Sequence, residues 1–320
     1  MTAGPIYERV AIIGCGLIGG SVARAVRAKG LAGEIVVGER EPALSRVKAL
    51  GLADRATDDL AEAVTGADLV LFAVPPGAME SAARAAAPGY RPGATITDVG
   101  SVKAAVTKAL LASAPDTVFV IPGHPIAGTE HSGPDAGFAT LFENRWVILT
   151  PHKAGDAAYD AAVDRLAAFW AGMGANVDRM DEQHHDLVLA VTSHLPHLLA
   201  YSLVGMAADM EEVTQAEVMK YSAGGFRDST RLAASDPIMW RDVFLNNKDA
   251  VLEILGRFTE DLQALSRAVR WGEGDKLQDL FTRTRAIRRG IIDAGQETAE
   301  PDFGRHHGIA PATSPKDGEA

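Results

Sequence analysis

The sequence predicts an α/β domain with a doubly wound, mostly parallel sheet, followed by an all-helical domain. Up to about residue 180, short apolar runs alternate with alanine-rich segments of helical character, the pattern of strand–helix–strand units. The short runs are continuously apolar, as expected for strands covered on both faces. After residue 180 the strand pattern stops, and apolar residues recur at helical spacing only. We therefore expect one domain over 1–180 and a second over 181–296.

The strands of the first domain are predicted from runs rich in Val, Ile, Leu and Phe that end at turn-forming residues. Pro75, Pro122 and Pro151 directly follow three of these runs, and each ends its strand because proline cannot donate a ladder hydrogen bond. The predicted strands cover 9–14, 34–39, 67–74, 93–99, 117–121, 145–150 and 175–180.

The second domain is predicted to be helical throughout. Pro196, inside the first helix, removes one backbone hydrogen bond and is expected to kink it. Gly224 and Gly225 are expected to give an irregular chain between helices. Residues 297–320 show no apolar periodicity and are predicted to be a disordered tail. The predicted helices cover 184–207, 211–222, 237–270 and 273–293.

Charge and composition narrow the class of protein. With 31 Lys and Arg against 42 Asp and Glu, the net charge of −11 argues against a nucleic-acid binder. The single cysteine, Cys15, cannot form an internal disulfide, which suits a reducing compartment. The sequence shows no signal peptide and no uninterrupted apolar stretch of 18 residues. We therefore expect a cytoplasmic protein that does not bind a membrane.

The stretch VAIIGCGLIGGS carries a phosphate-binding pattern. Gly14, Gly16 and Gly19 have the G-x-G-x-x-G spacing, directly after a strand and at the start of a helix. Glycines there allow a tight turn, close approach of the pyrophosphate and close packing of helix on strand. The pattern predicts a Rossmann-type domain that binds a dinucleotide, with Leu17 and Ile18 as further contacts at the helix N-terminus.

The residue that ends the second strand indicates which dinucleotide is bound. Glu39 lies twenty residues after Gly19, where a carboxylate accepts hydrogen bonds from the ribose 2′-OH and repels a 2′-phosphate. NAD is therefore expected and NADP is less favoured, although the adjacent Arg40 weakens this preference. Val74 and Pro75, which follow another apolar run, are expected to line the same cleft.

Polar side chains at the ends of two later strands predict a catalytic centre. Asp98 and Ser101 lie at the end of the run 93–99, and Ser101 is also expected to cap the next helix. His124 follows the run 117–121 in the stretch IPGHPIAGTE. Taken alone, such a histidine is more readily explained by packing. If the two strands are neighbours, Ser101 and His124 meet at the carboxyl edge, and the hydroxyl can hold the imidazole in one tautomer.

The helical domain carries further histidines. His194 and His197 are three residues apart and therefore lie on one helix face. A zinc site would need three or four ligands, and without a cysteine pair or an H-E-x-x-H pattern no metal is predicted. His184 and His185 are expected to be solvated at a polar helix start.

Three arginines are candidates for binding an anion: Arg227, Arg231 and Arg241. An arginine that faces a cleft can bind a carboxylate through two parallel hydrogen bonds. At least one of the three is expected to lie on a helix surface.

Taken together, six motifs resemble the prephenate/arogenate (cyclohexadienyl) dehydrogenase family of tyrosine biosynthesis. They occur in order and span roughly residues 10–245, as GCGLIGGS, TDVGSVK, GHPIAGTE, SHLPH, GGFRDSTR and SDPIMWRD. The resemblance implies NAD(P)-dependent oxidative decarboxylation of a cyclohexadienol to an aromatic ring. It also implies a homodimer built through the helical domains.

The resemblance also implies roles for individual residues. His124 matches the catalytic histidine that accepts the proton of the substrate's ring hydroxyl, and Ser101 matches the serine that orients it. Arg231 matches the arginine that binds a substrate carboxylate, and His197 the histidine that recognises substrate beside it. Positions that line the substrate pocket are matched by Thr129 and Trp240.

Several alternatives stay open. The substrate is prephenate, arogenate or both, and the second histidine of SHLPH favours prephenate. A β-hydroxyacid or pyrroline-5-carboxylate type reductase shares the domain plan, but the first of these relies on a second-domain lysine, and neither Lys220 nor Lys248 has a convincing pocket setting. A non-catalytic, NAD-sensing dimer would not need a paired base and anion site. The sequence does not decide whether tyrosine inhibits.

Overall fold

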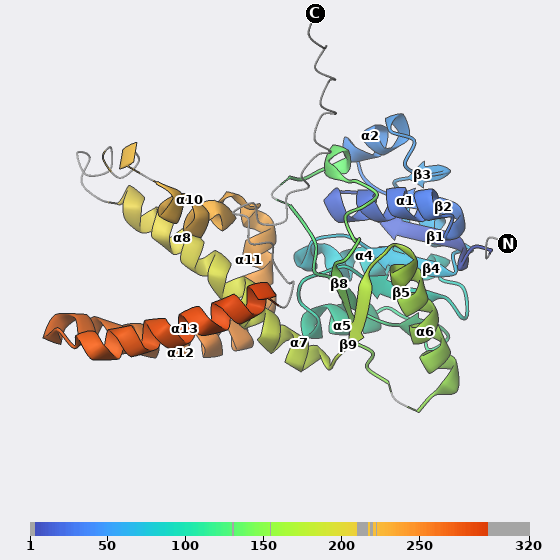
Figure 1. Cartoon of the computed structure of the whole chain (residues 1–320). Helices are drawn as coiled ribbons and strands as arrows, with labels where there is room; N and C mark the ends of the chain where they lie inside the picture. The colour runs from blue at the N-terminus through green and yellow to red at the C-terminus, as the bar shows by residue number, and fades with distance from the viewer. Residues whose placement is uncertain are drawn as a thin grey trace, which may run out of the picture. The chain divides into compact units, whose positions relative to one another are not determined.

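The structure is a computed structural model, shown in Figure 1, and it describes residues 4–129, 131–153, 155–209, 217, 220, 221 and 223–293. The chain divides into two compact units, Met1–Leu255 and Gly256–Ala320. The first unit contains all the strands of the described chain and the helices that surround them.

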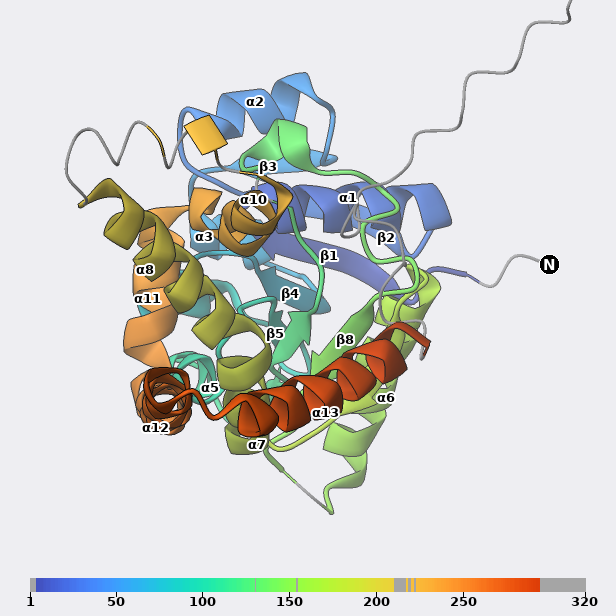
Figure 2. The same cartoon turned by 60° about the vertical axis from the view of Figure 1, so that its left-hand side comes forward.

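A six-stranded parallel sheet forms the centre of the first unit (Figure 1, Figure 2). Its order is β3-β2-β1-β4-β5-β6, so the direction of strand succession reverses between β1 and β4, the point where such sheets bind ligands. All neighbouring pairs are parallel, which confirms the predicted doubly wound sheet. The strands are β1 (Tyr7–Ile13), β2 (Ala32–Gly38), β3 (Arg55–Thr57), β4 (Leu69–Phe72), β5 (Thr95–Asp98) and β6 (Phe119–Val120).

Helices cover both faces of this sheet because its strands are apolar on both sides. In β1, Val10 and Ile12 pack into one buried cluster with residues of α1 and α6, while Ala11 and Ile13 pack into the opposite cluster with α3, α4 and α5. The helices are α1 (Leu17–Lys29), α2 (Ala43–Ala49), α3 (Leu60–Val64), α4 (Met79–Ala86), α5 (Ala104–Leu111) and α6 (Ala157–Gly172), with 3₁₀ turns η1 (Pro76–Ala78), η2 (Ala87–Gly89) and η3 (Pro134–Ala136).

A second, three-stranded sheet was not predicted as a separate sheet. Its strands are β7 (Gly123–Pro125), β8 (Trp146–Leu149) and β9 (Asn176–Arg179), with β7 antiparallel and β9 parallel to β8. The strand β7 itself was missed, as was β3, because a three-residue strand leaves no periodicity in the sequence. His124 therefore lies within a strand, opposite Ile148, and not in a loop.

The described residues after β9 are mostly helical, as predicted. They form α7 (Glu182–Leu189), a π-helical turn η4 (Ala190–His194), α8 (Leu195–Ala208), α10 (Gly224–Thr230), the 3₁₀ turn η5 (Arg231–Ala234) and α11 (Pro237–Asn246). Gly224 and Gly225 open α10, so the irregular chain expected there is wrong. The π turn comes directly before Pro196, where the sequence predicted a disturbed helix, and Pro196 sits in the first turn of α8, where its missing N–H is tolerated.

The long helix predicted over 237–270 is interrupted. Asn247, with φ −115° and ψ 33°, separates α11 from α12 (Lys248–Trp271). The cause is tertiary, since the Asn247 side chain is buried and bonds to another helix. In the second unit, α13 (Gly274–Asp293) coincides with the helix predicted over 273–293. The tail predicted over 297–320 lies outside the described residues, as does nearly all of the helix predicted over 211–222.

Contacts with the sheet hold α7 and α11 in the first unit. Trp240 and Val243 of α11 form a small buried cluster with Val102, which follows β5. The helix α7 contacts α5, and Figure 1 shows α8, α10 and α11 grouped beside the parallel sheet.

One helical run, Glu182–Ala208, is long and apolar enough to cross a membrane by length and composition alone, with a mean hydropathy of 1.5. A single such helix is weak evidence for a membrane span, because core helices of other proteins pass the same test. In this run His185, Asp186 and His194 are buried against other elements of the first unit.

Candidate active site

The glycine-rich loop joins β1 to α1 at the carboxyl edge of the sheet. Gly14 has φ +88°, and a Cβ on it would lie 2.6 Å from the carbonyl oxygen of Ala73, just beyond β4. A Cβ on Gly19 would lie 2.1 Å from the carbonyl oxygen of Gly14. Both positions therefore require glycine, one for backbone conformation and close strand contact, the other for helix packing.

Gly16 is glycine for a different reason. No heavy atom lies within 4 Å of a Cβ placed on it, so the space in front of this residue is open. Gly16 is the N-cap of α1, which has neither a side-chain cap nor an acidic residue in its first turn. The N–H groups of Leu17 and Ile18 belong to that turn and have no acceptor within the helix. A helix N-terminus that faces open space in this way fits the pyrophosphate of NAD.

Glu39 follows β2 and lies beside the same loop. Its carboxylate accepts the N–H of Cys15 at 2.7 Å and that of Arg40 at 2.8 Å. Burial, followed by the Glu39 charge, raises the pKa of the Cys15 thiol to about 12. The carboxylate is half-buried and keeps lone pairs for a ribose hydroxyl, whereas the Arg40 side chain is exposed.

Val74 and Pro75 follow β4 at the same edge. The Val74 side chain comes within 2.9 Å of a Cβ placed on Gly14, so it borders the loop directly. The loop, Glu39 and this segment thus surround the switch point between β1 and β4.

His124 is a buried imidazole whose Nδ1 lies 2.9 Å from Nε2 of His185. The two rings meet edge to face, with centroids 5.1 Å apart. Burial holds the pKa of His124 well below its ordinary value. The nearby His185, Lys103 and His194, which are positive when protonated, lower it further. The ring is therefore neutral at pH 7.

The partner of His124 is not the residue expected from the sequence. Among the described residues, the Ser101 side chain makes no hydrogen bond to His124, and it is His185 that faces Nδ1. Nor does Ser101 cap the following helix, because α5 begins after Lys103 and its first N–H groups bond to Asp186.

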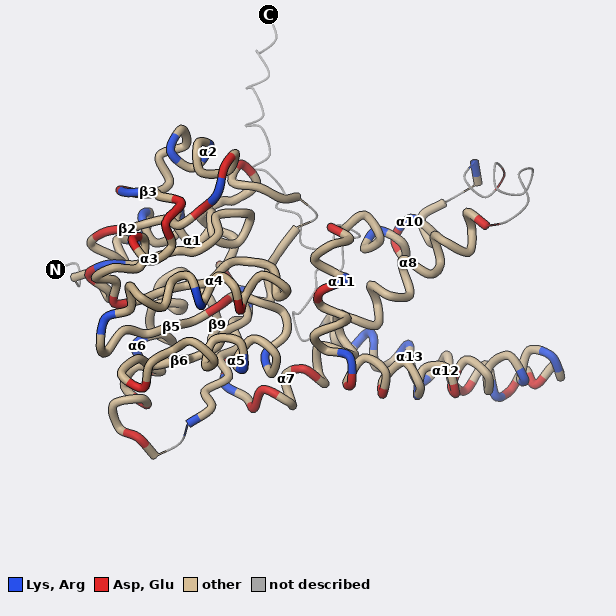
Figure 3. The backbone as a smooth tube through the Cα atoms, turned by 180° about the vertical axis from the view of Figure 1, so that it is seen from behind, with Lys and Arg blue, Asp and Glu red and all other residues tan. Residues whose placement is uncertain are grey.

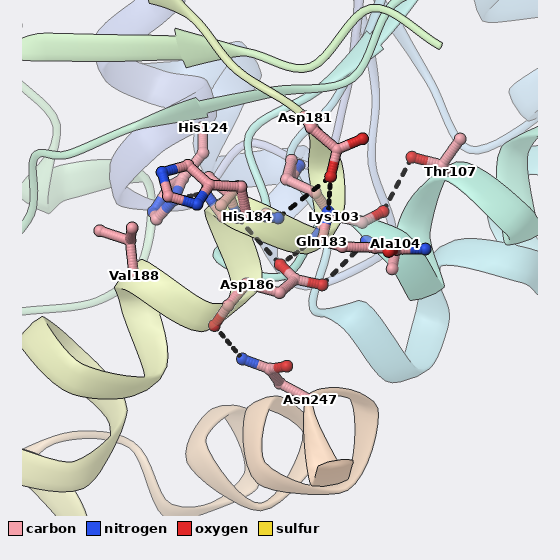
Figure 4. Close-up of polar contacts among 12 residues, drawn as sticks. Lys103, Ala104, Thr107, His124, Asp181, Gln183, His184, Asp186, Val188 and Asn247 are labelled. Carbon is pink, nitrogen blue, oxygen red and sulfur yellow. Dashed lines mark hydrogen bonds and ion pairs between the residues drawn. The ribbon is translucent and has the colours of Figure 1, made fainter. Parts of the chain in front are cut away.

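His185 was expected to be solvated, which is wrong, whereas the exposure expected for His184 is confirmed. The N-cap Asp181 begins α7 and turns His185, Asp186 and Leu189 inward. His185 Nδ1 lies 2.9 Å from Asp186 Oδ1. Asp186 also accepts the N–H of Lys103 at 2.7 Å and that of Ala104 at 3.0 Å, as Figure 4 shows.

Beneath His124 lies a fully buried ion pair between Lys103 and Asp98. Asp98 also accepts the N–H of Gly100 at 2.7 Å and of Gly123 at 3.1 Å, and Lys103 Nζ donates to the Gly123 carbonyl at 2.7 Å. Burial lowers the pKa of Lys103 and raises that of Asp98, and each charge opposes the shift of the other. The pair thus binds both the N–H and the carbonyl of Gly123, the residue before His124.

A second group of rings lies on α8 and α11. His197 stacks on Trp240 with centroids 3.5 Å apart, and its Nδ1 lies 2.8 Å from the Ser193 carbonyl oxygen. Burial lowers the pKa of His197 to about 4, opposed by that bond and assisted by the charge of Arg231. The role that the family resemblance implies for Arg231 stays a prediction.

His194 lies on the same helical run and is fully buried. Its Nδ1 lies 3.0 Å from Nδ2 of Asn247, which also donates to the Asp186 carbonyl at 2.8 Å. Burial lowers the pKa of His194 to about 4. The rings of His124, His185 and His194 all have lowered pKa values, so three neutral histidines lie on β7, α7 and η4.

Other candidates lie apart from this cluster. Arg227 pairs with Asp228 and Arg241 with Asp242, both with exposed guanidinium groups. Thr129 is exposed next to Glu130, which the structure does not describe, so its role stays a prediction. No group of three or more His, Cys, Asp or Glu in the described part of the chain is arranged to hold a metal ion.

Sequence reasoning missed His185, Asp186, Lys103 and Asn247 as site residues. For His185 a signal existed, because it is four residues before the apolar Leu189 and so shares its helix face. For Lys103 and Asn247 the described structure alone reveals the burial, since long polar side chains are normally exposed.

A dinucleotide loop at the switch point of a parallel sheet, with a neutral buried histidine at the same edge, defines an NAD-dependent oxidoreductase. Comparison with known proteins gives the particular family. Residues 22–179 match "Prephenate dehydrogenase, nucleotide-binding domain", and residues 181–283 match "Prephenate dehydrogenase, dimerization domain". The chain belongs to the prephenate dehydrogenase family, which confirms the resemblance seen in its motifs.

Individual relatives agree with this assignment. The chain is 43% identical to a cyclohexadienyl dehydrogenase of Zymomonas mobilis, over 89% of this chain and 97% of that protein. It is 35% identical to a prephenate dehydrogenase of Bacillus subtilis, over 92% of this chain and 79% of that protein. The crystal structure of prephenate dehydrogenase from A. aeolicus, in complex with hydroxyphenyl propionate and NAD⁺, matches with a TM-score of 0.81 at 34% identity, covering 89% of this chain and 98% of that one.

The glycine loop yields a prediction that separates cofactor binding from folding. Gly16→Ala should leave the unfolding free energy nearly unchanged but weaken NAD binding by at least about tenfold, because the new methyl group enters the space for the phosphates. Gly19→Ala should lower the unfolding free energy by about 1–3 kcal/mol through overpacking. Urea unfolding and NAD titration measure both effects. A Gly16→Ala protein with wild-type NAD affinity would contradict this placement of the phosphates.

The buried ion pair yields a second prediction. Lys103→Met should lower the unfolding free energy by about 3–5 kcal/mol, because Asp98 would stay buried without its counter-charge. The double variant Lys103→Met, Asp98→Asn removes both charges, so its unfolding free energy should fall less than that of Lys103→Met alone. Denaturant unfolding of both proteins tests this, and equal losses would argue against an ionised pair.

Proposed function

We propose that the protein catalyses the NAD-dependent oxidative decarboxylation of prephenate to 4-hydroxyphenylpyruvate, and that it also accepts arogenate, giving tyrosine. The observation that carries the proposal is the neutral, buried His124 at the carboxyl edge of the sheet that presents the dinucleotide loop. The names of the relatives, and the hydroxyphenyl propionate bound in the solved relative, support this class of substrate.

In this proposal His124 is the general base. NAD, when bound, accepts the hydride from the ring carbon that carries the hydroxyl. As that carbon gains carbonyl character, the hydroxyl proton moves to the imidazole of His124. The bond between the ring and its carboxylate then breaks, CO₂ leaves, and the electron pair completes the aromatic ring. The imidazolium returns its proton to the phenolate oxygen, so the reaction releases no net proton.

The substrate would be held from α8 and η5. Arg231, at the start of η5, carries a guanidinium that can bind a carboxylate through two hydrogen bonds. Its charge lowers the pKa of the His197 ring, which supports a common site for the two side chains. Trp240, stacked on His197 and buried, would form the apolar wall.

The state of His197 favours use of arogenate as well as prephenate. Nδ1 of this ring bonds to a carbonyl oxygen and therefore carries the proton, which leaves Nε2 as an acceptor. An acceptor matches the ammonium group on the side chain of arogenate, whereas the keto group of prephenate would need a donor such as Arg231. Parallel kinetics with both substrates, each with NAD and NADP, test this preference.

The other candidate functions have less support. A β-hydroxyacid type reductase would need a lysine that reaches the substrate. Lys220 and Lys248 are exposed, and Lys103 is engaged in a buried ion pair. An NAD sensor without turnover would bind the cofactor but produce no NADH from either cyclohexadienol.

We propose that the chain acts as a cytoplasmic homodimer through its helical part, with a functional border between 1–180 and 181–296. Apolar side chains remain exposed on α8, α11 and the start of α12, an area that a second copy would cover. They are Val204, Met206, Ile238, Met239, Leu245 and Leu252. In Figure 3, lysines and arginines are interspersed with acidic residues, which agrees with a protein that binds no nucleic acid. Light scattering after size-exclusion chromatography measures the oligomeric state.

Replacing the base tests the mechanism. His124→Asn should lower kcat by about 10²–10⁴-fold with either substrate, because no group remains to take the hydroxyl proton. NAD affinity should be nearly unchanged, since the phosphates bind at the glycine loop. Steady-state NADH production and NAD titration provide the two measurements, and an active variant would refute the role of His124.

The shifted histidines predict a pH dependence of activity. Because the folded-state pKa of His124 is lowered, the ring stays neutral and competent as pH falls through the ordinary histidine value of about 6.5. The acid limb of kcat/KM should therefore lie below pH 6.5. A pH profile in which activity halves at pH 6.5 or above would contradict a buried, neutral base.

The same shifts predict how stability depends on pH. In the unfolded chain the histidines bind protons below about pH 6.5, whereas folded His194 and His197 do so only near their pKa of about 4. The unfolding free energy should therefore fall as pH is lowered from 6.5 to 4. Urea unfolding across this range measures the slope, and His194→Gln should reduce it.

A further inference from the structure

We infer that His185 and Asp186 are positioning residues that hold His124 in the tautomer with Nδ1 protonated and Nε2 free to take the substrate proton. This inference rests on the proposed function, since it concerns how the base is kept ready. It follows from a continuous set of contacts, Asp186 to His185 to His124, that is closed to solvent.

The direction of the hydrogen bonds is set at Asp186. Both of its carboxylate oxygens accept main-chain N–H groups, from Lys103 at 2.7 Å and from Ala104 at 3.0 Å. These N–H groups belong to the first turn of α5, whose dipole favours a negative charge there. Since both oxygens already face N–H donors, the Asp186 carboxylate serves as an acceptor toward His185 as well.

From Asp186 the proton positions follow one by one. Nδ1 of His185 lies 2.9 Å from Asp186 Oδ1, so it must carry a proton and donate. In a neutral imidazole the other nitrogen is then an acceptor, so Nε2 of His185 presents a lone pair. Nδ1 of His124 lies 2.9 Å from that lone pair and must donate to it. Nε2 of His124 is thereby left unprotonated, which is the form that a general base needs.

The opposite tautomer would prevent catalysis. It would place a proton on Nε2 of His124, where the ring could donate to the substrate hydroxyl but could not take its proton. It would also leave two lone pairs facing each other between His124 and His185. Burial lowers the pKa of both rings, which keeps each of them neutral so that the alternation of donor and acceptor persists.

The charged groups around these rings do not supply an alternative partner. Lys103 acts on both histidines through its charge, but its ammonium group bonds to Asp98 and to the Gly123 carbonyl. His194 faces the same space, and its Nδ1 is taken by Asn247. In the part of the chain that the structure describes, His185 is the group at hydrogen-bonding distance from His124 Nδ1.

The helix that carries the two residues is itself fixed. Asp181 caps α7 by accepting the N–H groups of Gln183 and His184, and Asn247 donates to the Asp186 carbonyl at 2.8 Å. Figure 4 shows these bonds arranged around Asp186, between α7, the start of α5 and Asn247. The contacts from Asp186 through His185 to His124, here called the relay, therefore start from an anchored helix. This helix restrains small rotations of the His185 ring.

Two substitutions at position 185 separate hydrogen bonding from packing. His185→Gln places an amide oxygen close to the position of Nε2 and can still accept from His124, whereas His185→Met fills the space without an acceptor. We expect His185→Met to lower kcat at least about tenfold with little change in KM, because loss of the competent base affects the chemical step. His185→Gln should restore most of that loss. His184→Gln, an exposed neighbour on α7, is the matched control and should behave like wild type.

A spectroscopic measurement reports the tautomer directly. In protein labelled with ¹⁵N-histidine, the imidazole nitrogens of His124 should show Nδ1 protonated and Nε2 unprotonated at pH 7.5 in the wild type and in His185→Gln, but a mixture in His185→Met. A purely structural role for His185 would leave the His124 proton on Nδ1 in all three proteins.

The outcomes distinguish this inference from the proposed function. An active His124→Asn protein would refute the base itself. An inactive His124→Asn protein together with a His185→Met protein of wild-type kcat would refute only the relay. A wild-type spectrum with the His124 proton on Nε2 would also overturn the relay, and this measurement needs no variant that might misfold.

Discussion

The interaction on which the site depends is the binding of the Asp186 carboxylate to the first N–H groups of α5. It satisfies donors that a helix N-terminus leaves free, and it places a negative charge at the positive end of the helix dipole. Because α5 follows β5 closely, this contact joins the helical segment after residue 180 to the carboxyl edge of the parallel sheet. The ring of His185, and through it the ring of His124, takes its orientation from there.

Burial determines which side chains around His124 are charged and which are neutral. One pair, Asp98 with Lys103, lies below the site, where each group has the other and main-chain partners to offset its burial. The histidines around it have partners that suit a neutral ring, so desolvation removes their positive charge. A neutral base and a rigid main chain beside it thus have the same origin, which is the exclusion of water from this edge of the sheet.

The glycine-rich loop after β1 was predictable from the local sequence. Gly14, Gly16, Gly19 and Glu39 lie in a segment whose meaning is local, since the turn, the helix start and the strand end are covalent neighbours. The catalytic half was predicted only in part. His124 was found from its place after a strand, but the short strand β7 was not, and the partner assigned to His124 was Ser101, not His185. The helix break at Asn247 escaped prediction because it results from a bond to Asp186 and not from a helix-breaking residue.

By itself the sequence determined the fold class, the glycine-rich cofactor loop and the change from an α/β domain to a helical segment near residue 180, and it singled out His124 as the candidate base. These features follow from steric rules and periodicities that involve only residues close together in the sequence. They can therefore be recognised without knowledge of the tertiary structure. Only the tertiary structure decided which ring contacts His124, which charged side chains are paired in the interior and which histidines are buried. His124 and His185 are 61 positions apart and Lys103 and Asp186 are 83 apart. Hydrogen-bond direction and desolvation depend on such distant partners, so they come into existence only when the sheet edge and α7 meet.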